Sequence, residues 1–369
     1  MDSGMTGLHP GPVQPPADQA PRLVAWEVTR ACNLACAHCR ASAVDRPDPS
    51  ELSPDEGLDL IDQIADLGGQ TILILTGGEP LLRPDVFELA AHGTLRGLRV
   101  VMAPNGTLIN PQTAALMKRS GIQRISVSID GAAAEDHDRF RGVDGAFDQL
   151  MRGLHYAREA GIEFQVNTTV TRHNLPQVEA IQELAVSRGA AAHHIFLLVP
   201  TGRGRQLTDE VISAEEYEKV LNWFYERRDQ VDLQLKATCA PHYYRILRQR
   251  ARAEGRPVDF ATFGLDAMSR GCLGGQGFVF VSHTGQVQPC GYLDLDCGQL
   301  REKNFGTIYR ESPVFLKLRD QSQYSGKCGR CEFWKVCGGC RARAFAATGD
   351  YLAEEPLCLY QPARAGAEA

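Results

Sequence analysis

Short apolar stretches alternate with amphipathic helical segments along the first part of this chain, and this alternation constrains its fold most strongly. The stretches are rich in Val, Ile and Leu and lie at 23–28, 71–75, 98–103, 124–129, 163–170 and 193–198. Strands that are buried on both faces read as near-continuous apolar runs, and helical connections make their neighbours parallel. The pattern therefore predicts an α/β fold built on a parallel sheet.

Capping signals mark where several of the intervening helices begin. The run SPDE at 53–56 is a capping box with proline at the first helical position. Asn174 with Pro176 predicts a second helix start, and Ser213 with Glu216 predicts a third. This pattern fits an open six-stranded (β/α) barrel and a doubly wound sheet equally well.

Three cysteines follow the first predicted strand in the run CNLACAHC. Cys32, Cys36 and Cys39 have the spacing C-x3-C-x2-C, which leaves one iron of a four-iron cluster without a protein ligand. An open iron corner can bind a cofactor or a substrate. A zinc site would need a fourth ligand nearby, and His38 is the candidate for that alternative.

The run resembles the C-x3-C-x-Φ-C signature of the radical S-adenosylmethionine (SAM) enzymes, with His38 in the aromatic position. The resemblance implies that the three cysteines are catalytic, because they hold a [4Fe–4S] cluster whose open iron chelates SAM. Reduction then cleaves SAM to a 5′-deoxyadenosyl radical that abstracts hydrogen from carbon. The resemblance also selects the partial (β/α)6 barrel, with the site at the carboxyl ends of the strands.

Polar residues follow the successive strands at the end where such a barrel binds SAM. Gly77, Gly78 and Glu79 follow the second strand, where glycine allows close backbone approach and the acid can accept an ammonium group. The resemblance implies that this motif contacts the methionyl amino group. It also implies contacts to the ribose and carboxylate of SAM, although each residue alone could be a cap or turn residue. The residues concerned are Asn105, Ser126, Ser128, Asp130 and Asn167.

The C-terminal part of the chain is rich in cysteine and glycine. Pairs of the type C-x2-C are common in zinc ribbons, so zinc remains an alternative here. Behind a radical SAM core, the order of these cysteines resembles the SPASM extension, which carries auxiliary four-iron clusters. The last pair departs from that family, with two residues between its cysteines instead of three.

The resemblance to SPASM domains implies two sets of cluster ligands. An outer cluster would be held by Cys328, Cys331, Cys337 and Cys358, and an inner cluster by Cys272, Cys290 and Cys340. Two fully ligated cubes need eight ligands, and this pattern provides seven. The eighth is Cys297, Cys239 or a group other than cysteine, and we name Cys297 for this place.

These features divide the chain into five predicted parts. They are a Pro-rich tail at 1–21, a radical SAM barrel at 22–210, a helical bridging segment at 211–271, a SPASM-type auxiliary-cluster domain at 272–361 and a tail at 362–369. The chain has twelve cysteines but no signal-peptide pattern and no apolar run of about 20 residues. We therefore expect metal binding in the cytoplasm and no membrane association. The net charge of −6 argues against nucleic acid as a partner.

Longer stretches make the resemblance narrower. AWEVTRACNLACAHCRA, HIFLLVPTGRGR, LKATCAPHYYRILRQRA and CGGCRARAFAATGDYLAEEP are similar to the heme b synthases of the siroheme-dependent heme pathway. This implies oxidative decarboxylation of two propionates of Fe-coproporphyrin III, with electrons from a donor such as ferredoxin or flavodoxin. The alternatives are a related tetrapyrrole-modifying enzyme, such as a didecarboxysiroheme deacetylase, and a SPASM peptide maturase.

A tetrapyrrole substrate presents carboxylates around a flat apolar ring. Arg203, Arg205 and Lys236 are therefore predicted to bind carboxylates. His242 is a candidate axial ligand or acid–base group, and Tyr243 either packs on the macrocycle or belongs to the core. An auxiliary cluster could accept the electron that remains after each decarboxylation.

Overall fold

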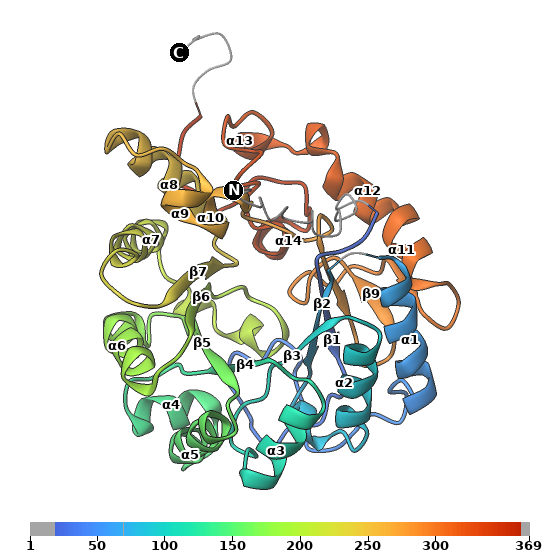
Figure 1. Cartoon of the computed structure of the whole chain (residues 1–369). Helices are drawn as coiled ribbons and strands as arrows, with labels where there is room; N and C mark the ends of the chain where they lie inside the picture. The colour runs from blue at the N-terminus through green and yellow to red at the C-terminus, as the bar shows by residue number, and fades with distance from the viewer. Residues whose placement is uncertain (1–18, 69, 363–369) are drawn as a thin grey trace, which may run out of the picture.

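The described residues of the computed structural model, 19–68 and 70–362, contain one ten-stranded curved sheet with helices on its outer side (Figure 1). The strand order is β10-β9-β8-β1-β2-β3-β4-β5-β6-β7, and β1 to β7 are parallel. The six predicted strands are confirmed as β1 to β6, and β7 extends the barrel. Their bounds are β1 (Leu23–Glu27), β2 (Ile72–Thr76), β3 (Arg99–Met102), β4 (Arg124–Ser128), β5 (Glu163–Val170), β6 (Ala192–Leu197) and β7 (Gln234–Thr238).

Helices connect the parallel strands and cover their apolar side. They are α1 (Pro54–Asp66), α2 (Val86–Leu95), α3 (Pro111–Arg119), α4 (Ala134–Arg141), α5 (Ala146–Glu159), α6 (Val178–Arg188), α7 (Ala214–Arg227) and α8 (His242–Ala253). The predicted capping boxes of α1 and α7 are confirmed. The start of α6 differs, because Asn174 donates its side-chain amide to the carbonyl oxygens of Asp130 and Thr169 and does not cap the helix.

Alternation along the inner strands separates an apolar side from a polar side. On β5, the side chains of Phe164, Val166, Thr168 and Val170 are buried, whereas Gln165, Asn167 and Thr169 are half-buried. Because successive side chains of a strand point to opposite faces, this second set faces the lumen of the curved sheet. His194 of β6 and Lys236 of β7 are in register with Asn167 and lie on the same side. The lumen is therefore polar.

The C-terminal region adds strands that the sequence pattern did not predict. β8 (Phe278–Val281) pairs in parallel with β1, and β9 (Gln286–Gln288) and β10 (Gly298–Gln299) continue the sheet in antiparallel order. The apolar run of β8 is only four residues long and lies among glycines and cysteines, and its partner strand is about 250 residues away in the sequence. Only the tertiary contact identifies it as part of the barrel sheet.

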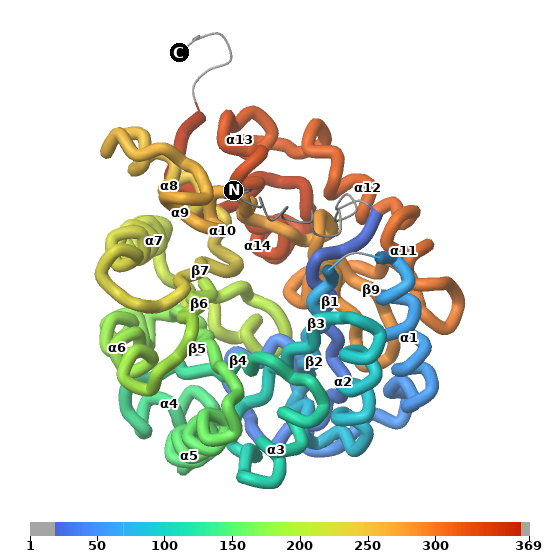
Figure 2. The backbone as a smooth tube through the Cα atoms, in the orientation of Figure 1, coloured from blue at the N-terminus to red at the C-terminus, as the bar shows by residue number. Residues whose placement is uncertain are grey.

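The remaining helices belong to the bridging and C-terminal regions. They are α9 (Phe260–Phe263), α10 (Leu265–Met268), α11 (Phe305–Glu311), α12 (Pro313–Arg319), α13 (Gly326–Gly329) and α14 (Arg341–Thr348). Short 3-10 turns occur at η1 (Pro80–Leu82), η2 (Leu175–Gln177), η3 (Gly202–Gln206), η4 (Thr208–Glu210) and η5 (Gln321–Gln323). Figure 2 shows the C-terminal segment, in orange and red, on the side of the barrel between α8 and α1.

The predicted tails fall largely outside the described residues. The predicted limits at 210 and 271 stay predictions, although the sheet runs through both the barrel and the C-terminal region. Within the described ranges, no helix is both long and apolar enough to cross a membrane.

Candidate active site

Cys32, Cys36 and Cys39 lie together in the loop after β1, around Leu34 and Ala146. Each sulfur atom accepts a hydrogen bond from an N–H group. The backbone N–H of Leu34 donates to Cys32 Sγ (3.4 Å), and that of Ala43 donates to Cys39 Sγ (3.4 Å). Arg141 Nη1 donates to Cys36 Sγ (3.5 Å). Such donors stabilise thiolates, so this loop fits a cluster that is ligated by three cysteines.

His38 occupies the aromatic position of the cysteine loop. Its ring stacks on Phe140 with a centroid distance of 4.3 Å and an interplanar angle of 9°. Burial lowers the pKa of His38 to about 4, so the ring is neutral near pH 7. The ring stacked on Phe140 fits the role of an aromatic residue at this position.

Asp130 and Arg141 form a buried ion pair beside the cysteine loop. Asp130 also accepts the backbone N–H of Thr169 at 2.7 Å, so its carboxylate connects β5 to the guanidinium that reaches Cys36. We predicted Asp130 as a SAM contact, and the structure gives it this supporting position. Arg141 itself was missed, because nothing in the sequence distinguishes it from other arginines at helix ends.

Gly77, Gly78 and Glu79 pack directly against the chain that enters the cysteine loop. A Cβ on Gly77 would lie 2.5 Å from the carbonyl oxygen of Thr29, and one on Gly78 would lie 2.2 Å from that of Ala31. The glycines thus allow close approach to protein backbone, whereas the sequence suggested approach to a ligand.

Glu79 is fully buried at the end of this motif. Its carboxylate accepts the backbone N–H groups of Leu81 (3.0 Å) and Asn105 (2.6 Å). Burial nevertheless raises the pKa of Glu79 to about 7. A buried carboxylate with a raised pKa is well suited to accept the ammonium group of an incoming ligand.

The other predicted SAM contacts lie near the cysteine loop or along the lumen. Asn105 donates to the side-chain oxygen of Asn33 (2.7 Å) and towards Cys32 Sγ (3.9 Å). Ser128 of β4 is in register with Asn167 of β5, and both are half-buried. Ser126 lies two residues before Ser128 on β4, so the two side chains point to the same face of the strand.

Arg203 supports the cysteine loop from the segment after β6. Its Nε donates to the carbonyl oxygen of Cys36 (2.9 Å) and its Nη1 to that of Ala43 (2.7 Å). Gly202 fits below this loop at φ +56°, and an added Cβ would lie 2.2 Å from the carbonyl oxygen of Arg40. These hydrogen bonds position the cluster loop, whereas Arg203 Nη2 is buried and has no hydrogen-bond partner within the described structure. Carboxylate binding by Arg203 therefore stays a prediction.

The other predicted substrate residues are dispersed. Tyr243 is fully buried between α7 and α8, with its ring against Phe224, so it belongs to the core. His242 lies beside the C-terminal cysteines, and Arg205 is exposed. Lys236 lies in the barrel lumen beside His194.

Cys328, Cys331, Cys337 and Cys358 line one partly open cavity. His242 borders the same cavity, and within the described structure neither nitrogen of its buried ring has a hydrogen-bond partner. A buried ring without partners indicates space for a polar group in this cavity. The donor set and the orphaned ring together fit a cluster bound by these four cysteines.

A second group of cysteines lies closer to the barrel. Cys239, at the end of β7, and Cys290 both pack against buried Cys340 and its neighbours Leu293 and Ala342. Burial raises the pKa of the Cys290 thiol to about 12, and the nearby thiols of Cys272 and Cys340 add to this effect. The inner set that we predicted is therefore brought together, but with Cys239 in it.

Cys297 lies apart from the inner group. Its sulfur points to the carbonyl oxygen of Leu295 (3.7 Å), and the side chain packs against the main hydrophobic core. The prediction that Cys297 joins Cys272, Cys290 and Cys340 does not match this placement. Residue spacing in the sequence could not show whether Cys297 or Cys239 joins the inner group. Only the fold separates them, because it places Cys297 against the main core and Cys239 with Cys290 and Cys340.

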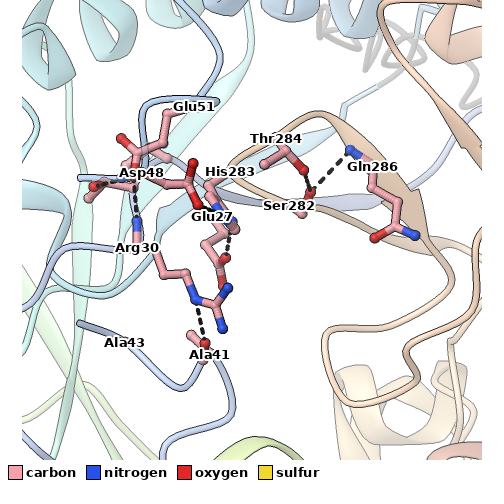
Figure 3. A network of polar contacts seen from close by, with 12 residues as sticks. Glu27, Arg30, Ala41, Ala43, Asp48, Glu51, Ser282, His283, Thr284 and Gln286 are labelled. Atoms are coloured by element: carbon pink, nitrogen blue, oxygen red, sulfur yellow. Dashed lines mark hydrogen bonds and ion pairs between the residues drawn. The ribbon is translucent and has the colours of Figure 1, made fainter. Parts of the chain in front are cut away.

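A buried polar network joins the cysteine loop to the C-terminal region (Figure 3). Glu27 of β1 accepts from Arg40 Nη2 (2.7 Å) and contacts His283 Nδ1 (2.8 Å), which lies in the turn after β8. Arg40 follows Cys39 directly, and its Nη1 also reaches the carbonyl oxygen of Gly291 beside Cys290 (3.5 Å). The cluster loop and the inner cysteine group are therefore neighbours.

The zinc alternative gains no support from the described side chains. Sulfur ligands of one tetrahedral zinc lie about 3.8 Å apart. Across residues 19–68 and 70–362, no three His, Cys, Asp or Glu side chains lie close enough together to hold a single metal ion.

Comparisons with known proteins agree with this geometry. Residues 26–185 match the Radical SAM superfamily, and residues 272–332 match SPASM, an iron–sulfur cluster-binding domain. A relative from Nitratidesulfovibrio vulgaris named AdoMet-dependent heme synthase is 62% identical over 343 residues, which are 93% of this chain and 93% of the relative. A relative from Methanosarcina barkeri named Fe-coproporphyrin III synthase is 34% identical over 353 residues, 91% of this chain and 87% of the relative.

A solved structure shows the same fold. SuiB of Streptococcus suis, bound to its precursor peptide SuiA, superposes with a TM-score of 0.70 at 17% identity, over 93% of this chain and 76% of SuiB. The cofactors of this chain are accordingly SAM and [4Fe–4S] clusters. The chain belongs to the radical SAM superfamily, as an oxidoreductase with a C-terminal SPASM domain.

Proposed function

We propose that this enzyme oxidatively decarboxylates two propionate side chains of Fe-coproporphyrin III to vinyl groups and so forms heme b. The observation that carries the proposal is the similarity, over nearly the whole of both chains, to a relative named AdoMet-dependent heme synthase. The likeness to the peptide-binding SuiB has far lower identity and supports the fold alone. The relative named Fe-coproporphyrin III synthase makes a related tetrapyrrole reaction the main competing function.

Residues of the barrel would hold SAM against the first cluster. Cys32, Cys36 and Cys39 would bind three of its irons, and Glu79 would accept the methionyl amino group. When bound, this cluster and SAM supply the radical that removes hydrogen from the substrate. Arg141 and Arg203 hold the cysteine loop in place, and Asn167 and Ser128 offer polar side chains along the lumen.

Lys236 is our candidate for binding a substrate carboxylate. Its side chain lies on the lumen side of β7, and burial lowers its pKa. Within the described structure no carboxylate lies within 4.0 Å of its ammonium group, and Asp266, which acts on its charge, is paired with Arg228 at 2.7 Å. A desolvated cation without an ion-pair partner favours an anionic ligand. A propionate group would complete this pair.

Each conversion must balance atoms and electrons. One hydrogen atom leaves the propionate carbon next to the ring, the carboxylate leaves as carbon dioxide, and one electron passes to an acceptor as the vinyl double bond forms. We assign the electron to an auxiliary cluster of the C-terminal region. Two conversions consume two SAM molecules, whose cleavage needs electrons from a low-potential donor such as ferredoxin or flavodoxin.

An experiment with two alternative substrates distinguishes the proposed reaction from the competing tetrapyrrole reaction. Reconstituted enzyme, SAM and a low-potential reductant are incubated without oxygen with either Fe-coproporphyrin III or didecarboxysiroheme, and the porphyrins are identified by mass spectrometry. We expect only Fe-coproporphyrin III to lose carboxyl groups. Loss of acetate groups from didecarboxysiroheme, with Fe-coproporphyrin III unchanged, would replace the proposed function with the competing one.

A further inference from the structure

We propose that Cys239 is the fourth protein ligand of the inner auxiliary cluster, together with Cys272, Cys290 and Cys340. The inner cluster then has no open iron corner and serves to transfer electrons. This inference concerns the cluster alone and holds whichever tetrapyrrole is the substrate.

Four separate segments bring these cysteines together. Cys239 and Cys290 pack with buried Cys340 in one cluster. Cys272 joins them through Gly274, where an added Cβ would lie 3.7 Å from both Cys272 Sγ and Cys290 Cβ. The backbone N–H of Cys272 also donates to the carbonyl oxygen of Cys337 (3.1 Å), which places Cys272 between the inner and outer groups.

The backbone of Cys239 is held in an unfavourable conformation. Its φ of +54° is one of two positive values among the non-glycine residues of the described chain. Such a conformation costs on the order of 1–3 kcal/mol and persists only where the surroundings impose it. Here the carbonyl oxygen of Cys239 accepts hydrogen bonds from Arg343 Nη2 (3.0 Å) and from the Tyr217 hydroxyl (3.3 Å). These two buried donors fix the direction in which the Cys239 side chain leaves the backbone.

The count of ligands then closes without Cys297. Two four-iron cubes need eight thiolates. The outer cavity is lined by four cysteines and the inner group contains four, whereas Cys297 lies in the main core with its sulfur towards Leu295. Each set therefore supplies the four thiolates that one four-iron cube needs.

A fully ligated inner cluster cannot bind substrate through iron. Its position suits electron transfer, because Arg40 contacts the backbone beside Cys290 and directly follows Cys39 of the SAM cluster. The inner cluster therefore lies close enough to the SAM cluster to accept an electron released there.

The test compares two single substitutions in the full-length, anaerobically reconstituted enzyme. Cys239→Ala removes the proposed ligand, and Cys297→Ala is the matched control at the cysteine that the structure excludes. Wild type and Cys297→Ala should each contain about 12 irons per chain, the sum of three four-iron clusters. Cys239→Ala should lose about one to four irons and, after oxidation, should show the EPR signal of a three-iron cluster if a partial cluster remains.

The opposite pattern would overturn the proposal. Loss of iron in Cys297→Ala with full content in Cys239→Ala would make Cys297 the ligand. Full iron content and unchanged EPR spectra in both variants would mean that the inner cluster has a non-cysteine ligand or an open corner. Cys239→Ser serves as a second variant should the alanine protein not fold, because a serine ligand changes the EPR spectrum of a cluster that it binds. None of these readouts depends on a tetrapyrrole, so failure of the proposed function would leave them intact.

Discussion

Arg343 of α14 connects the C-terminal cysteine region to the barrel through a buried charge. It pairs with Glu355 (3.1 Å) and donates to the carbonyl oxygens of Leu197 at the end of β6 (3.1 Å) and of Cys239 (3.0 Å). Arg343 is 3% exposed and Glu355 is fully buried. Arg343→Met would keep much of the side-chain volume but leave the carboxylate without its partner.

The size of the effect follows from this burial. Removing one member of a buried ion pair costs about 3–5 kcal/mol, because the other charge stays buried and uncompensated. For a protein of this size the unfolding entropy is roughly 0.7 kcal/mol per degree, so the melting temperature should fall by about 4–7 °C. Arg343→Met/Glu355→Gln should recover part of this loss, since it leaves no unpaired charge.

The assay is thermal unfolding of the reconstituted enzyme without oxygen, at one fixed scan rate. Arg301→Met is the control, because Arg301 makes an exposed ion pair with Glu56 (2.6 Å). Exposed pairs contribute about 0–1 kcal/mol, so this variant should melt within roughly 1 °C of wild type. A shift in Arg343→Met no larger than that of the control would refute the assigned role of the buried pair.

Three further predictions concern ligands and the first cluster. Glu79→Gln should weaken SAM binding about 10- to 100-fold; since the pKa of Glu79 is raised to about 7, wild-type affinity should also fall as pH drops below 7, and calorimetry should show no such fall in the variant. Lys236→Met should weaken Fe-coproporphyrin III binding by a similar factor in absorbance titrations, with Lys236→Arg retaining it; an equal loss of SAM affinity would contradict the assignment. Arg141→Met removes a cation and a donor from Cys36, so the SAM cluster should become harder to reduce in EPR-monitored titrations; an unchanged or higher potential would contradict this.

Much of the barrel could be predicted because its signals are local. The apolar runs of β1 to β6 and the capping boxes of α1 and α7 depend on residues close in sequence. Strand β8 could not be predicted in the same way, since its four residues join the sheet through pairing with distant β1.

The site residues show the same division. The three cysteines of the first loop and Glu79 lie within short motifs, and the structure brings them together. Arg203 has the chemistry of a carboxylate ligand, but its contacts with the cysteine loop come from 160 or more residues away. Likewise, residue spacing left Cys297 and Cys239 as alternatives, and only the fold shows that Cys239, at the end of β7, packs with Cys290 and Cys340.

The most direct test of the proposed function is the product formed from Fe-coproporphyrin III. Enzyme, excess SAM and a low-potential reductant are incubated anaerobically, and the porphyrins and 5′-deoxyadenosine are quantified together by mass spectrometry, with Cys36→Ala as the inactive control. We predict stepwise loss of two carboxyl groups, heme b as the final product and two molecules of deoxyadenosine per heme. Deoxyadenosine without any change in the porphyrin would retain the radical SAM chemistry and contradict the substrate.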